Sequence, residues 1–550
     1  MDFKKEVAKL LKKEKITEEL LEIPSNPSLG DYALPCFSLA KLYKKPPQIV
    51  AQELAAKIKP TKLVKKIQAT GPYLNFFIDK GQYNRAIIEQ KPKKKKINKT
   101  IVIEFSSPNI MKPFSVAHLR STMIGNSIEK LSRLQGYKTV KINHLGDWGT
   151  QFGKGIYAFE AWGDRKKLKN EPIKYLFELY VKFHQEAEKD PVLDDKAREW
   201  FLKLEKGDKK ALKYWKEFKD LSLKEYNKIY KRLNVKFDSW AGESFYQKQL
   251  QPTIGLLKKK GLVEESEGAL IVNLEKYNMT PCIVQKSDGS TIYATRDLAA
   301  AIYRAKKYKF AECVYVVDAR QSLHFQQVFR VLDLAGFSWA GTCKHVPFGL
   351  MKFGEDVMST REGKVVFLED VLDKAREKVL HIIDDKNPKL KNKAKVAEQV
   401  SIGAIVFWDL SHDRVRDVNF DWNTILDFEG ETGPYVQYTH ARACSILRKG
   451  KMSARPQYEK LTKEQEIAVV KELAEFDEMA TQAAEQYKPS ILAKYLITLC
   501  QRFNEFYQHC PVVKEEDKSL ARARLNLVKK VRDVLEEGLG LLGIEAPEEM

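Results

Sequence analysis

The chain has 550 residues, which is too long for one hydrophobic core, so we expect several domains. Its hydrophobic content of 43% is ordinary for a globular protein, and no apolar run is long enough to span a bilayer. The formal net charge of +21 favours a polyanionic partner, nucleic acid first and an acidic membrane surface second, although solubility alone also explains surface lysines.

The seven cysteines are scattered, odd in number and contain no C-x-x-C pair. This pattern favours a reducing compartment and argues against a zinc ribbon or a disulfide framework. We therefore expect a cytoplasmic location. We expect no metal site, because no H-E-x-x-H motif or metal-spaced histidine pair occurs.

Residues 1–85 are predicted to form a small separate domain. Helical patterns at 7–15 and 49–59 flank the stretch GDYALPCFSLA, and GPYLNFFID at 71–79 is typical of a strand. The run QKPKKKKINK at 90–99 is predicted to be a solvated linker, with a nucleic-acid-binding patch as the alternative.

Residues 101–154 contain the most informative pattern. Residues 101–105 predict a buried strand, a loop with two prolines follows, 118–134 has helical spacing, and 139–143 predicts a second strand. Gly136 is placed to end the helix. This strand–loop–helix–strand order is typical of a parallel, doubly wound sheet.

Polar side chains cluster where that helix begins: Ser115, His118, Arg120, Ser121 and Thr122. A helix N-terminus favours phosphate, and a His and an Arg beside it would add hydrogen-bond donors to a developing negative charge. The alternative is that His118 is an ordinary surface residue of the first turn.

Residues 155–265 are charged and helical in pattern, and we expect an insertion whose aromatic residues form its core rather than a base-stacking platform. From residue 266, strands alternate with helices, which predicts the rest of the parallel sheet. The strands are expected at 269–272, at 282–284, before Tyr293, at the start of ECVYVVDARQSLHFQQVFRVLDLAGF (312–337) and on both sides of VMSTREGK (357–364). After about residue 370 the chain is helical, and a plain bundle explains the apolar face at 491–512.

Two further stretches carry candidate chemistry. VMSTREGK could close over a triphosphate, although its residues by themselves favour a polar hairpin. A guanidinium presents a planar fork of donors that a carboxylate meets best, and YATRD places Tyr293 and Asp297 where a pocket for such a group would lie.

The stretch SPNIMKPFSVAHLRSTMIGN (107–126) resembles the ATP-binding segment of arginyl-tRNA synthetases, which are class I aminoacyl-tRNA synthetases. Their HIGH motif ends at His118, and the match continues through GDWGTQFG (146–153). Ser115 replaces the first His of the motif, and Ala117 is its small residue. FEGETGPYVQYTHARACSIL (428–447) resembles the DALR-type anticodon-binding domain of the same family.

VMSTREGK resembles the second class I motif, KMSKS, with Val357 in place of its first Lys and Arg361 near its end. In the family a Lys just before HIGH takes over part of that charge, and Lys112 occupies the position. The resemblance implies catalytic roles for His118, Lys112, Ser115 and Arg361. It implies ATP binding by Pro108, Ser115, Ala117, His118, Met358 and Ser359, and arginine binding by Glu104, Asn109, Tyr293, Asp297 and Gln321. For tRNA binding it implies Tyr435, Gln437, Tyr438 and Arg442.

The expected fold is multidomain α/β, with a Rossmann-like doubly wound catalytic core, a small α+β N-terminal domain and an all-α anticodon-binding bundle. The expected boundaries are 1–85 for the tRNA-contacting domain, 86–370 for the catalytic domain, 371–430 for a helical connection and 431–550 for the anticodon-binding domain.

The expected activity is arginine–tRNA ligation with ATP as substrate, carried with Mg²⁺, and with activation that depends on tRNA. No permanent cofactor and no membrane partner are expected, and the chain is expected to be a monomer. A catalytically weak or inactive tRNA-binding relative is the main alternative, motivated by Ser115 and Val357. A basic RNA-binding or scaffold protein is a third, which leaves the ordered pocket residues unexplained.

Overall fold

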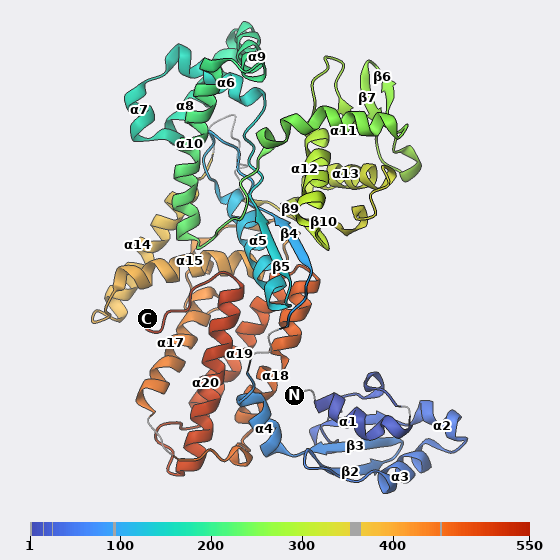
Figure 1. Cartoon of the computed structure of the whole chain (residues 1–550). Coiled ribbons are helices and arrows are strands. Elements are labelled where there is room, and N and C mark those ends of the chain that lie inside the picture. Colours follow the sequence, from blue (N-terminus) through green and yellow to red (C-terminus); the bar gives the residue numbers. More distant parts are fainter. Residues whose placement is uncertain (1–2, 15, 25, 92–94, 353–364, 451–453) are drawn as a thin grey trace. The chain divides into compact units, whose positions relative to one another are not determined.

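The computed structural model describes the chain except for residues 1–2, 15, 25, 92–94, 353–364 and 451–453 (Figure 1). Two compact units are distinguished. The first comprises residues 1–93, 442–476 and 498–534, and the second comprises residues 94–441, 477–497 and 535–550.

A four-stranded parallel sheet forms the centre of the second unit. Its strands are β4 (Thr100–Glu104), β5 (Lys138–Ile142), β9 (Glu312–Asp318) and β10 (Cys343–Phe348), in the order β10-β9-β4-β5. Residues 101–104 are all buried, which fits their unbroken apolar run and a strand covered on both faces. From β4 the chain crosses to β5 on one side of the pair β4 and β9, and from β9 it crosses to β10 on the other side. The strand order therefore reverses between β4 and β9. In open α/β sheets, ligands bind at such a point.

Helix α5 (Val116–Leu134) follows β4 and packs closely on the end of that strand (Figure 1). A Cβ on Gly125 would lie 2.3 Å from the Phe105 side chain, so glycine is required for this approach. The doubly wound parallel core predicted from the sequence is confirmed, with α5 beginning two residues earlier than its apolar spacing indicated.

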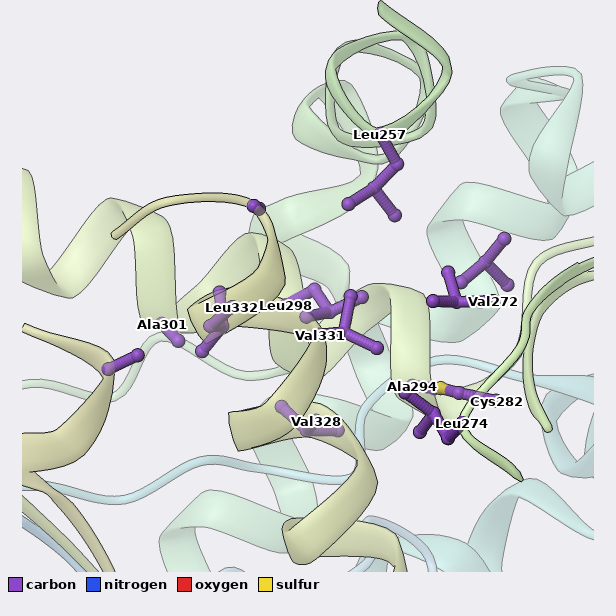
Figure 2. Packing of buried hydrophobic residues seen from close by; sticks show 13 residues of the cluster. Leu257, Val272, Leu274, Cys282, Ala294, Leu298, Ala301, Val328, Val331 and Leu332 are labelled. Atoms are coloured by element: carbon purple, nitrogen blue, oxygen red, sulfur yellow. The ribbon is translucent and has the colours of Figure 1, made fainter. Parts of the chain in front are cut away.

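Helices α12 (Tyr293–Tyr308) and α13 (Ser322–Leu334) flank the strand β9 in sequence. Their buried faces share an apolar cluster with helix α11 (Gln247–Lys259) and strands β7 (Ala269–Val272) and β8 (Cys282–Gln285). In this cluster Leu298, Val328 and Val331 are fully buried (Figure 2). This cluster fixes where the first turns of α12 and α13 lie, and both turns carry residues of the candidate site.

The strands predicted at 269–272 and 282–284 do not join the parallel sheet, and that prediction was wrong. With β6 (Glu264–Ser266), strands β7 (Ala269–Val272) and β8 (Cys282–Gln285) form a separate antiparallel sheet in the order β6-β7-β8. The reason is chain length, because parallel neighbours need a crossover of a dozen or more residues. Only Glu267 and Gly268 separate β6 from β7, and both have positive φ, as a tight hairpin turn requires.

Two other predicted strands are reduced to single bridges. The strand predicted just before Tyr293 is a single bridge between Thr291 and Gln285. In the strand predicted after VMSTREGK, the described residues form a single bridge, between Phe367 and Ser115. Short two-stranded pairing occurs instead between β11 (Met351–Lys352) and β12 (Val418–Asn419), which are parallel.

The region 155–265 is helical, as predicted. Its helices are α6 (Thr150–Trp162), α7 (Arg165–Asn170), α8 (Pro172–Lys189), α9 (Val192–Glu205) and α10 (Lys209–Arg232), followed by α11. The aromatic rings contact one another rather than forming an open face: Trp148 packs edge-on against Trp215, and Trp200 against Tyr214. Further along the second unit lie α14 (Leu368–Lys386), α15 (Lys393–Ser411) and α16 (Trp422–Ile425). Helices α14 and α15 share an apolar core.

In the first unit, residues 3–88 form an α+β fold. Its antiparallel sheet has the order β1-β3-β2, with β1 (Tyr32–Pro35), β2 (Val64–Thr70) and β3 (Tyr73–Ile78). The helices are α1 (Phe3–Leu11), α2 (Phe37–Tyr43), α3 (Pro47–Lys57) and α4 (Lys80–Ile88). The small α+β domain predicted at the N-terminus is therefore confirmed as a fold.

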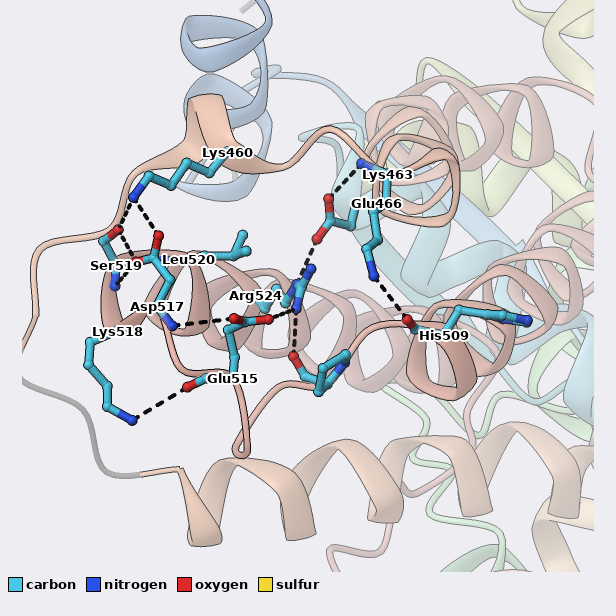
Figure 3. Close-up of polar contacts among 11 residues, drawn as sticks. Lys460, Lys463, Glu466, His509, Glu515, Asp517, Lys518, Ser519, Leu520 and Arg524 are labelled. Atoms are coloured by element: carbon cyan, nitrogen blue, oxygen red, sulfur yellow. Dashed lines mark hydrogen bonds and ion pairs between the residues drawn. The ribbon is translucent and has the colours of Figure 1, made fainter.

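The last part of the chain is all-α, as predicted. Its helices are α17 (Gly433–Lys449), α18 (Glu464–Glu485), α19 (Pro489–His509) and α20 (Lys518–Leu541). In the first unit, the buried guanidinium of Arg524 contacts Glu466 at 2.6 Å and Glu515 at 2.5 Å and donates to the carbonyl of Pro511 (Figure 3). A buried charge needs such partners to offset its desolvation.

Candidate functional site

The loop after β4 is held in a strained conformation. Ser106, Ser107 and Met111 all have positive φ, which is uncommon for residues other than glycine. Helix α10 supports the loop, because the Tyr230 hydroxyl lies 2.6 Å from Ser106 Oγ and the Tyr226 hydroxyl donates to two loop carbonyls. Strain that the surrounding structure maintains in this way clusters at ligand sites.

His118 occupies the first turn of α5, and its protonation state is fixed by its contacts. Its Nδ1 accepts a hydrogen bond from the backbone N–H of Ser115 at 3.0 Å, which places the ring proton on Nε2. Burial lowers the pKa of His118 to about 4, with a smaller lowering contribution from the charge of Lys112 and against the opposing effect of the Ser115 hydrogen bond. At neutral pH the ring is therefore an uncharged donor through Nε2–H.

The other residues predicted for ATP binding lie around this turn. Ser115 is buried, and its Oγ lies 3.0 Å from His118 Nδ1. Pro108 is buried, and its carbonyl accepts from the backbone N–H of Gly146. Ala117 is partly buried at the start of α5, and the Lys112 ammonium lies over the ring of Tyr180. The predicted residues Met358, Ser359 and Arg361 lie outside the described residues.

Arg120 does not face a ligand, and the prediction that it adds donors for phosphate was wrong. Its side chain is fully buried, with Nε 2.8 Å from Asp409 on α15. It also donates to the backbone carbonyls of Gly349 at 2.7 Å and Arg416 at 3.0 Å. Ser121 is likewise buried and donates to a carbonyl of β9. These residues fix the position of α5 rather than bind substrate.

Asp297 lies in the second turn of α12 and carries the carboxylate predicted to meet a guanidinium. Its Oδ2 lies 2.6 Å from Nε2 of His324, in the first turn of α13. The two side chains are 19% and 23% exposed, so the pair lies at the edge of the interior and still reaches solvent. Tyr293, at the start of α12, is 68% exposed.

Glu104, at the carboxyl end of β4, is paired with an arginine of the protein itself. Arg304 Nη1 lies 2.5 Å from Glu104 Oε2, and both side chains are almost completely buried. Arg304 Nη2 also lies 3.4 Å from Nδ1 of His144. The carboxylate of Glu104 therefore has an internal counter-ion, which the sequence did not reveal.

The remaining residues predicted for arginine binding are exposed. Asn109 lies in the loop after β4, and its Oδ1 would lie 2.1 Å from a Cβ on Gly146, so the side chain covers that glycine. Gln321 lies just after β9. The predicted residues thus come from the ends of β4 and β9 and the start of α12, where the sheet order places a ligand site.

Sequence reasoning missed four titratable or charged residues near this candidate site: His144, Glu243, Arg304 and His324. Burial raises the pKa of Glu243 to about 7, against the opposing charges of Arg296 and His144. Of these, only His324 had a detectable signal, since it lies three residues after Gln321 in the quoted stretch ARQSLHF. The charged partners of the others are more than 50 residues away in sequence.

The residues predicted to contact tRNA lie on α17 and differ in their exposure to solvent and in their hydrogen-bond partners. Gln437 is fully buried, and its amide donates to two backbone carbonyls, which argues against the predicted tRNA contact and for a structural role. Tyr438 is 41% exposed and Tyr435 is partly buried. Arg442 donates to the side chain of Asn504.

Within the described ranges, no three His, Cys, Asp or Glu side chains gather in a way that could hold a metal ion. Among the helices that the structure describes, none combines the length and the apolar character needed to cross a bilayer.

Three family models together match most of the chain. A family model described as "tRNA synthetases class I (R), catalytic domain" matches residues 83–422. A DALR anticodon binding domain matches residues 436–550, and an arginyl tRNA synthetase N terminal domain matches residues 1–78.

Similar proteins match over the whole chain. Arginine–tRNA ligases of Clostridium beijerinckii and Halothermothrix orenii are 49% and 46% identical, each alignment covering 100% of both chains. Among solved structures, the Thermus thermophilus arginyl-tRNA synthetase has a TM-score of 0.83 and 27% identity, covering 100% of this chain and 99% of that one. The chain therefore belongs to the arginine–tRNA ligase family of class I aminoacyl-tRNA synthetases.

Proposed function

We propose that the chain is an arginine–tRNA ligase. In the first step a carboxylate oxygen of L-arginine attacks the α-phosphorus of ATP, and pyrophosphate leaves as arginyl-adenylate forms. In the second step a hydroxyl of the terminal tRNA ribose attacks the arginyl carbonyl, and AMP leaves. The similarity to arginine–tRNA ligases over the full length of the chain carries this conclusion and speaks against an inactive relative.

The phosphates of ATP are proposed to lie at the N-terminus of α5. A neutral His118 that donates through Nε2 suits a phosphate oxygen, because Nδ1 is held by Ser115 and the ring proton is on Nε2. Lys112 adds positive charge, while Pro108 and Ala117 line the approach. Catalysis is then positioning and charge stabilisation, with no side-chain nucleophile.

Residues Met358, Ser359 and Arg361 are assigned to the same ATP site from their sequence alone. Mg²⁺ is proposed to travel with the phosphates, since the described residues offer it no cluster of carboxylates.

The arginine side chain is proposed to be held by Asp297 and Tyr293, from the first two turns of α12. A carboxylate can accept two parallel hydrogen bonds from a guanidinium, which gives both affinity and geometric selection. Asn109 and Gln321, both exposed, are assigned to the other polar groups of the substrate. Glu104 joins them through Oε1, because Oε2 faces Arg304.

On α17, Tyr435, Tyr438 and Arg442 are proposed to contact tRNA. We also propose domain boundaries at residues 85, 370 and 430, a monomeric state and a cytoplasmic location.

The test is ATP–pyrophosphate exchange with L-arginine, with and without arginine tRNA. We expect exchange only when tRNA is present, because activation is proposed to require bound tRNA. Exchange in both conditions would refute that requirement and leave the ligase activity standing. Absence of exchange in both, with tRNA still bound, would refute the ligase activity.

A further inference from the structure

The carboxylate of Asp297 already has a partner in the structure. His324 Nε2 lies 2.6 Å from Oδ2, and this contact joins the first turn of α13 to the second turn of α12. The buried faces of both helices pack into the apolar cluster that contains Leu298 and Val328. The two side chains are therefore presented from rigid elements rather than from loops.

This contact restricts the orientation of the carboxylate. The terminal torsion of an aspartate side chain is broad, so an unpartnered carboxylate samples many planes. A charge-assisted hydrogen bond to one oxygen selects one of them. Because Oδ2 has a second lone pair, the same oxygen and Oδ1 together still offer the edge that a planar guanidinium requires.

The charges around the pair keep Asp297 ionised. Burial alone would raise the pKa of Asp297, but the hydrogen bond from His324 and the charges of His324, His144 and Arg304 outweigh it and lower that pKa. Asp297 is therefore a carboxylate at neutral pH, and His324 is the donor.

We propose that His324 is a positioning residue that makes the site selective for a guanidinium over an ammonium, by fixing the plane of the Asp297 carboxylate. The inference rests on the proposed function, in which Asp297 receives the arginine side chain. A guanidinium depends on that plane, because it bonds through two parallel donors. An ammonium behaves as a point charge and depends on it much less.

The experiment compares His324→Leu, which removes the donor at similar volume, with His324→Gln, whose Nε2 can replace the lost nitrogen. The full-length protein with arginine tRNA is assayed by ATP–pyrophosphate exchange. The readouts are the KM for L-arginine, the KM for ATP and the inhibition constant of L-lysine. His345→Leu is the matched control, because His345 is also partly buried and its Nε2 bonds a backbone carbonyl, that of Val317.

For His324→Leu we expect the KM for arginine to rise about tenfold, while the inhibition constant of lysine and the KM for ATP change less than threefold. His324→Gln and His345→Leu should stay within threefold of the unmodified protein in all three. Equal weakening of arginine and lysine, or a glutamine variant as impaired as the leucine variant, would overturn the proposal. If His324→Leu fails to fold, His324→Asn, whose shorter amide does not reach Asp297, replaces it.

Asp297→Asn separates this proposal from the one on which it rests. If it raises the KM for arginine about a hundredfold while His324→Leu leaves that KM unchanged, only the role of His324 is refuted. If Asp297→Asn itself leaves the KM for arginine unchanged, the assignment of Asp297 to the substrate is wrong.

Discussion

The neutral state of His118 predicts an acid sensitivity that a single substitution should remove. Burial lowers the pKa of His118 from its usual 6.5 to about 4. Between these two values the unfolded chain binds a proton that the folded chain does not, so lowering the pH destabilises the fold. At pH 4.5 the loss from this one residue is about 2.5 kcal/mol relative to pH 7.5.

His118→Asn is the informative change. Its Oδ1 can replace Nδ1 as the acceptor for the Ser115 N–H, so the helix start is retained, but the side chain no longer titrates and lacks the Nε2 donor. Hydrogen exchange of the α5 amides measures the opening free energy locally. We expect the unmodified protein to lose about 2.5 kcal/mol more than His118→Asn when the pH falls from 7.5 to 4.5.

His118→Gln is the complementary control. It keeps a donor near Nε2 but loses the acceptor for Ser115, so its opening free energy should lie about 1 kcal/mol below that of His118→Asn at both pH values. Arginine-dependent exchange should fall about 10²- to 10³-fold in His118→Asn and less in His118→Gln, because only the former lacks the donor. Equal acid losses in the unmodified protein and His118→Asn would refute the reasoning that burial keeps the ring neutral.

Three further outcomes are expected. Arg120→Met should destabilise the protein by about 3–5 kcal/mol, because it leaves the Asp409 carboxylate buried without a partner, and Arg120→Met with Asp409→Leu should recover much of the loss in thermal unfolding. Gly125→Ala should lower the melting temperature at a cost of about 1–3 kcal/mol, whereas Gly255→Ala, where nothing lies within 4 Å, should raise stability by about 0.5–1 kcal/mol. Raising salt from 50 to 200 mM should weaken tRNA binding at least tenfold, and a salt-independent dissociation constant would contradict a role for the net charge of +21.

The sequence predicted those features that depend on residues close to one another along the chain. The apolar spacing of residues 118–134 and the polar cluster at its start belong to one stretch of chain, so helix α5 and the place of the candidate ATP site were predicted from neighbouring residues, with the helix start two residues too late. The alternation of strands and helices around residues 101–143 likewise predicted the parallel core, since a parallel pair needs a helical crossover. The short strands near residue 270 were assigned to the wrong sheet, because a strand's partner is not encoded in its own apolar pattern.

The sequence by itself therefore determined the fold class, the family and which polar residues to examine. Only the tertiary structure decided what those residues contact: Arg120 turns inward to Asp409, Glu104 faces Arg304, and Asp297 is held by His324. The physical reason is the distance along the sequence over which each kind of interaction acts. Helix caps and apolar periods act over a few residues, whereas the partner of a buried charge is set by which strands and helices become neighbours, and that depends on the whole chain.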